Sequence, residues 1–97
     1  MLNNRQKAQL KGLASTLKVK YQVGKNEVSE SLLDMLNKAL VAHELIKIDV
    51  LNSYGGSINE LAIDLSVKLN AEIVHVVGKV IVLYRKNKDN PKIKLVK

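Results

Sequence analysis

The stretch IVHVVGKVIVLYR, residues 73–85, decides the fold of this chain. Residues 73–77 and 80–85 are rich in β-branched residues, and Gly78-Lys79 between them suits a tight two-residue turn, so the stretch predicts a β-hairpin. Residues 80–84 are apolar at every position instead of alternating with polar residues. That pattern predicts a strand that the rest of the chain covers on both faces.

Upstream of the hairpin, three helical patterns alternate with two strand patterns. Residues 4–17 carry leucines at positions 10, 13 and 17. A second helix is predicted after Ser29, and a third after the capping box Ser57-x-x-Glu60. Residues 19–23 and 45–51 alternate as strands do. The order α-β-α-β-α-β-β predicts a single α/β domain with a mixed four-stranded sheet and three helices.

The composition argues against several classes of function. The 97 residues suit one domain, and no apolar run approaches the roughly 18 residues that a membrane span needs. The polar start is unlike a signal region, so we expect a cytoplasmic protein without membrane contact. There is no cysteine, and His43 and His75 lie far apart in sequence, which argues against a metal site. Catalytic motifs are missing as well, so we expect neither an enzyme nor a cofactor.

The charge of the chain is segregated along its length. Residues 1–25 carry six cations and no acid, and residues 79–97 carry six lysines and Arg85 against Asp89 alone. Residues 26–78, between them, carry eight acids and three lysines. If the fold brings the two basic ends together, they create a one-sided positive field that attracts a polyanion. We expect both ends to gather around the turn at Gly24, with the carboxylates on the opposite side.

Two groups of residues are candidate contacts for such a polyanion. Gly24-Lys25-Asn26 lies between a strand and a helix, where successive backbone amides of a turn can point at one phosphate oxygen. The second group lies on one face of the first predicted helix and on the strand after it: Lys7, Lys11, Lys18 and Lys20. The plain alternatives are a turn that only joins two elements and a lysine face that is only solvated.

Two further features bear on how the chain would bind. Lys79 and Arg85, on the hairpin, are additional candidates that could equally be solvated strand ends. The chain has three tyrosines and neither Phe nor Trp, which argues against an aromatic platform on which bases stack. Binding is therefore expected to act on backbone and shape.

Several motifs together resemble a known family. The chain resembles the CRM (chloroplast RNA splicing and ribosome maturation) domain in its stand-alone bacterial form, the YhbY family. The resemblance covers about residues 3–85 and rests on motifs in this order: Arg5-Gln6-Lys7, Leu13-Ala14, Val23-Gly24-Lys25-Asn26, the helix starting at Ser29-Glu30, HELIK at 43–47, and VGKVIVLYR at 77–85.

This resemblance implies a fold like the C-terminal domain of translation initiation factor three, and an RNA-binding role. Bacterial members are associated with the assembling large ribosomal subunit. Residues 1–85 would form the CRM-like domain and residues 86–97 a basic tail. The family's G-x-x-G loop, similar to the loop with which KH domains clamp nucleotide backbone, falls on residues 24–27. Glu27 replaces its second glycine. Either Glu27 points away towards the second helix, which we favour, or the lysine stripe carries the binding.

The sequence thus predicts a non-catalytic, monomeric RNA-binding module that docks on structured ribosomal RNA during large-subunit assembly. The alternative is a protein-interaction module that uses its charged surfaces without contacting RNA. DNA is a less favoured partner, because no strongly basic recognition helix with base-reading side chains is evident.

Overall fold

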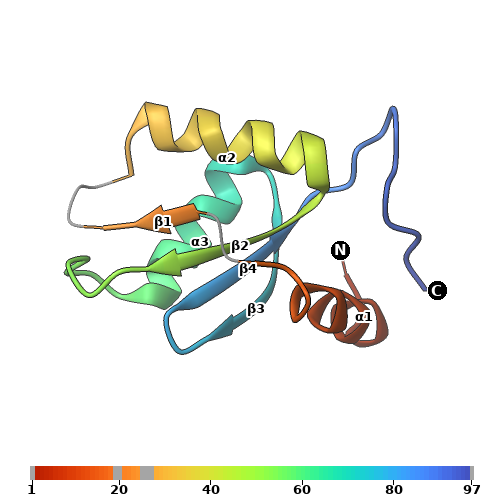
Figure 1. Ribbon diagram of the computed structural model, residues 1–97, viewed down its shortest axis with the longest axis horizontal. Helices are drawn as coiled ribbons and strands as arrows, with labels where there is room; N and C mark the ends of the chain where they lie inside the picture. The colour runs from red at the N-terminus through yellow and green to blue at the C-terminus, as the bar shows by residue number, and fades with distance from the viewer. Residues whose placement is uncertain (1, 19–20, 25–27, 97) are drawn as a thin grey trace.

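A computed structural model describes residues 2–18, 21–24 and 28–96. Its sheet has the strand order β1-β2-β4-β3, in which β1 is parallel to β2 and the other neighbours are antiparallel. The predicted α/β domain with a mixed four-stranded sheet and three helices is confirmed (Figure 1). In chain order the elements are α1 (Asn4–Ala14), β1 (Tyr21–Val23), α2 (Glu30–His43), β2 (Leu45–Val50), α3 (Ile58–Leu69), β3 (Glu72–Val77) and β4 (Val80–Tyr84).

The hairpin predicted from residues 73–85 joins β3 to β4. Val77 pairs with Val80 across the turn, and Gly78 adopts a φ of +57°, a conformation that glycine reaches without a steric cost. The register shifts between Ile73 and His75, which marks a bulge in β3.

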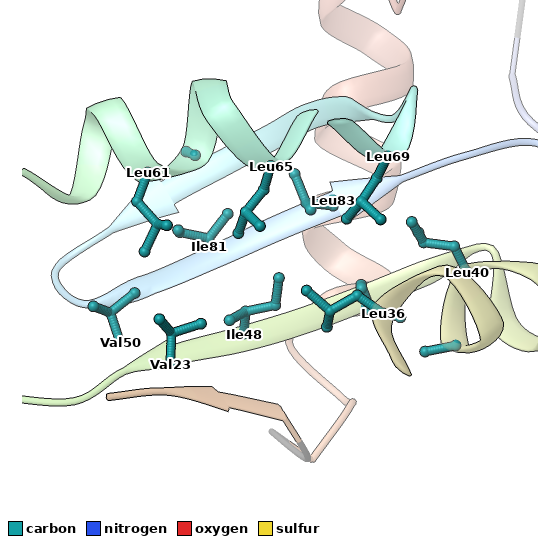
Figure 2. Close-up of a cluster of buried hydrophobic side chains, with 13 residues drawn as sticks. Val23, Leu36, Leu40, Ile48, Val50, Leu61, Leu65, Leu69, Ile81 and Leu83 are labelled. Carbon is teal, nitrogen blue, oxygen red and sulfur yellow. The ribbon is translucent and has the colours of Figure 1, made fainter. Parts of the chain in front are cut away.

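The sheet carries one hydrophobic core on each of its faces. Helices α2 and α3 cover one face, and the larger core lies between them and the sheet (Figure 2). Helix α1 covers part of the other face, where Leu10 and Ala14 pack over a smaller core (Figure 1). The side chains of β4 alternate between the two cores, with Ile81 in the larger and Val82 in the smaller. The prediction of a strand buried on both faces is therefore confirmed.

Side chains fix the starts of the three helices. The Ser29 hydroxyl accepts the Leu32 amide at the start of α2, at 3.1 Å, and Ser57 accepts the Glu60 amide at the start of α3, at 3.4 Å. Helix α1 has a complete capping box that the sequence analysis did not predict. There the Asn3 and Gln6 side chains each accept the other residue's backbone amide.

Helix α1 is shorter than the predicted 4–17, because it ends at Ala14. The hydroxyls of Ser15 and Thr16 donate back to the carbonyls of Gly12 and Leu13, at 2.6 and 2.8 Å. Such local bonds compete with helical ones and suit a helix end. Lys18 consequently follows the helix instead of extending its lysine face.

The chain after β4 folds back onto the domain. Ile93 and Leu95 pack against the smaller core, which includes the buried side chains of Leu10 and Tyr84. The Gln9 side-chain amide donates to the Lys94 carbonyl at 2.8 Å and accepts the Val96 amide at 2.8 Å. The basic tail therefore lies beside α1, and the two basic ends of the chain meet (Figure 1).

Candidate nucleic-acid interface

Gly24 lies at the end of the sheet where β1 and β2 stop and β4 begins. Val23 pairs with Val50, whose amide donates to the Lys79 carbonyl at 2.7 Å, so Gly24 and Lys79 belong to the same end (Figure 1, left). Lys25 and Asn26, the other candidates in this turn, lie outside the described residues, as does Glu27.

Gly24 packs closely against the loop after β2. A Cβ at Gly24 would lie 3.2 Å from the Ser53 hydroxyl and 3.4 Å from a Leu51 methyl group. A Cβ at Gly56 would lie 2.9 Å from the Tyr54 hydroxyl. Both glycines thus allow tight packing within the domain, a role that the sequence pattern alone did not reveal for the Gly55-Gly56 loop.

Helix α1 presents cations at the opposite end of the molecule. The side chains of Arg5 and Lys11 are exposed and that of Lys7 is half-buried, while Lys18 is exposed in the segment after the helix. Within residues 2–18, 21–24 and 28–96, none of these cations forms an ion pair with an acid. Lys20, the remaining member of the predicted stripe, lies outside the described residues.

The other face of the sheet has a different charge pattern. Lys38 pairs with Asp34 on α2 at 3.0 Å, and Lys68 pairs with Asp64 on α3 at 3.2 Å. Glu30 and Glu60 occupy the first turns of these helices, where a carboxylate complements the helix dipole. Charge is therefore separated across the sheet: among the described residues the α1 cations form no ion pair, whereas α2 and α3 carry paired lysines and an excess of acids.

The prediction that both basic ends gather around Gly24 is wrong about where they meet. The ends do meet, but beside α1, near the start of β2 and the end of β4. Gly24 and Lys79 lie at the other end of the sheet (Figure 1). The reason is that Glu44 and α1 bind the tail, and both positions are remote from the first turn.

Arg85 lies at the α1 end of β4 and its guanidinium is occupied within the domain. It donates to the Asn37 side-chain oxygen at 2.8 Å, to the Asn37 carbonyl at 3.2 Å and to the Leu69 carbonyl at 2.7 Å. Asn37 belongs to α2 and Leu69 to the end of α3, so Arg85 links the two helices across the end of the sheet.

Glu44 is an organising residue that the sequence analysis did not single out. Its side chain is completely buried, and its oxygens accept the backbone amides of Asn87 at 2.7 Å, Lys92 at 2.5 Å and Ile93 at 2.7 Å. Burial alone raises the pKa of Glu44, but these three amides and the nearby Lys92 lower it below its ordinary value. The carboxylate is therefore charged at neutral pH and holds the tail.

Two grooves flank this end of the molecule. One, of about 480 Å³, is lined by Leu13, Leu17 and Tyr21, with Lys18 and Lys47 among its polar residues. The other, of about 460 Å³, lies between the tail and α1 and is lined in part by Gln6, Lys86, Lys92 and Lys94.

Other kinds of site find no support in the described ranges. Within them, no group of three or more His, Asp or Glu side chains is placed to hold a metal ion. No helix there is both long and apolar enough to cross a bilayer.

These features define a small α/β domain with a cationic helix on one face of its sheet. The chain belongs to the CRS1/YhbY (CRM) domain family, whose model matches residues 2–85. It is 36% identical over 95 residues to the probable RNA-binding protein YqeI of Bacillus subtilis, covering 98% of this chain and 99% of that protein. It is 33% identical over 86 residues to the probable RNA-binding protein PA4753 of Pseudomonas aeruginosa, covering 89% and 83%.

A solved structure is also similar. The solution structure of SAV1595 from Staphylococcus aureus, a candidate RNA-binding protein, matches with a TM-score of 0.82 and 36% identity, covering 99% of this chain and all of that one. The predicted resemblance to the CRM domain is thereby confirmed.

Proposed function

We propose that this protein binds RNA, mainly through the phosphate backbone. The observation that carries the proposal is the charge separation across the sheet. The α1 cations lack acidic partners among the described residues, whereas the α2 and α3 lysines are paired. Unpaired cations on one face are available to replace the counterions of a polyanion. The naming of several relatives as RNA-binding proteins supports the same conclusion.

We further propose that the bound RNA is structured ribosomal RNA and that the protein assists assembly of the large ribosomal subunit. This finer statement rests on the family resemblance. Its contacts would fall in two regions: the turn Gly24, Lys25 and Asn26 in one, and Lys7, Lys11, Lys18 and Lys20, from α1 and the segment after it, in the other. Lys79 shares the Gly24 end of the sheet, so it fits the first region better than Arg85, whose guanidinium binds Asn37 and Leu69. In this proposal the protein is a monomeric, non-catalytic factor that acts in the cytoplasm.

A salt titration of RNA affinity tests the electrostatic core of this proposal. If about four phosphates are neutralised, the slope of log affinity against log salt is near −3 for single-stranded segments. The double change Lys7→Glu and Lys11→Glu should weaken binding to every RNA sequence. Lys38→Glu with Lys68→Glu changes the net charge equally on the other face and should have a smaller effect. A slope near zero, or equal losses in both double variants, would contradict the proposal.

Two further experiments separate the partners. Crosslinking in cell extract followed by sequencing of the recovered RNA should enrich large-subunit ribosomal RNA. Enrichment of unrelated RNA would support RNA binding but contradict the proposed role in ribosome assembly. Competition with duplex DNA should be weak. Protein-only complexes that persist at high salt would favour the alternative, a protein-interaction module.

A further inference from the structure

We propose that the docked tail and α1 together form a second RNA-contacting surface, and that Glu44 is the residue that positions it. The inference rests on the proposed RNA binding but adds a site that is separate from the Gly24 turn. Its ligand is the sugar-phosphate backbone of RNA, held in the groove between the tail and α1.

Glu44 fixes the tail to the domain. One carboxylate accepts three backbone amides from residues 87–93, and its side chain has no exposed surface. Glu44 also adopts a φ of +63°, although a helix end with positive φ ordinarily favours glycine. The three charge-assisted hydrogen bonds of the Glu44 side chain offset the cost of this backbone conformation. The tail is thus a built part of the domain.

Beyond the residues that Glu44 binds, the tail runs along α1. Ile93 packs on the smaller core, and Gln9 then binds both the Lys94 carbonyl and the Val96 amide. The Gln6 side-chain amide adds a bond to the Val96 carbonyl at 2.9 Å. These contacts run the tail beside α1 and shape the groove of about 460 Å³ between them.

This path brings the cations of the tail together. The tail has one acid, Asp89, and its exposed cations are Lys86, Lys88, Lys92 and Lys94. Three of them line the groove, and none forms an ion pair with a described acid. Across the groove, α1 contributes the neutral Gln6 to the lining. A groove whose tail wall carries three lysines, and whose described lining contains no acid, fits successive phosphates better than it fits a folded protein surface.

The decisive variant is Glu44→Gln, because two explanations predict opposite results. The change raises the net charge by one, so long-range attraction alone predicts tighter RNA binding. Our proposal predicts binding that is about fivefold or more weaker. A glutamine presents an NH₂ group where Glu44 accepts amide protons at both oxygens, so at least one bond is lost and the tail is released. Amide exchange at Asn87, Lys92 and Ile93 should become faster, while protection of β4 is retained.

Two milder changes keep the test valid if Glu44→Gln disturbs folding. Gln9→Ala leaves the net charge and the cores intact, and should speed exchange at Val96 and weaken RNA binding about twofold to fivefold. Lys92→Gln with Lys94→Gln removes two cations and should make the salt slope shallower by about 1.4. Its matched control, Lys38→Gln with Lys68→Gln, should leave the slope nearly unchanged.

The outcomes separate this inference from the proposed function. Tail variants that bind RNA like the parent, beside a Lys7/Lys11 variant that does not, would overturn the second surface and leave RNA binding intact. Tighter binding by a folded Glu44→Gln protein would overturn it as well. If Lys92→Gln with Lys94→Gln and the control Lys38→Gln with Lys68→Gln give the same slope of log affinity against log salt, the groove does not contact phosphate.

Discussion

At the scale of single residues, the Glu44 carboxylate links protonation to docking of the tail. Its folded-state pKa lies below its ordinary value of 4.5, because three amides and Lys92 outweigh the effect of burial. A lowered pKa means that Glu44 stabilises the fold fully above the unfolded-state pKa, and that this contribution is lost as the pH falls through the folded-state pKa.

This linkage predicts how the free energies of unfolding of the parent protein and of Glu44→Gln differ with pH. Loss of the charged acceptor in Glu44→Gln should lower the free energy of unfolding at pH 7 by about 1–3 kcal/mol. The difference from the parent should shrink as the pH falls from 4.5, the ordinary value, through the lowered folded-state pKa of Glu44, where the parent carboxylate becomes protonated. Urea denaturation of both proteins between pH 3 and pH 7 measures it. A difference that is constant over this range would show that the amide bonds do not depend on the charge.

Arg85 gives the second prediction at this scale. Its guanidinium joins α2 to α3 through Asn37 and Leu69, so its loss affects the fold more than the ligand. Arg85→Gln should lower the free energy of unfolding by about 1 kcal/mol, because the exposed Asn37 oxygens and the part-buried Leu69 carbonyl lose their charged donor. RNA affinity, measured where the variant is fully folded, should change less than in Lys7→Gln. A larger affinity loss for Arg85→Gln would place this residue in the RNA-binding site.

At the scale of elements, α1 depends on very few buried residues. Leu10 and Ala14 are its buried side chains, and Leu10 has no exposed surface. Leu10→Ala should therefore lower the free energy of unfolding by about 2–5 kcal/mol, because it leaves a cavity in the smaller core. Leu13, which is 40% exposed, is the matched control, and Leu13→Ala should have a smaller effect. Equal effects in urea denaturation would mean that α1 does not dock as described.

The features that the sequence predicted well are those fixed by interactions between residues close together in the chain. The Gly78 turn and the Ser29 cap act over a few residues, and both were found where the pattern placed them. Contacts between distant residues were missed. Glu44 holds amides more than forty positions away, and the choice of acceptors for Arg85 depends on where α2 packs and where α3 ends. A lysine stripe can be read from spacing, but whether a cation is paired depends on the packed neighbours.

At the scale of the whole molecule, the sheet separates two electrostatic environments. The shortest dimension of the molecule is 23 Å, about twice the Debye length of roughly 10 Å at 0.1 M salt. Charges on α1 and the tail are therefore screened from those on the outer surfaces of α2 and α3. A polyanion that approaches from the α1 side meets cations that form no ion pair within the described part of the chain, which favours electrostatic steering of association.

This separation predicts that the placement of charge controls the rate of RNA association. In stopped-flow measurements with labelled RNA at about 50 mM salt, Lys7→Glu with Lys11→Glu should slow association about tenfold and change dissociation less. Lys38→Glu with Lys68→Glu has the same net charge and should slow association much less, because those positions are screened from the approaching ligand. The difference between the two variants should shrink as salt rises. Equal slowing in both variants would mean that net charge, and not the basic face of α1, governs the encounter.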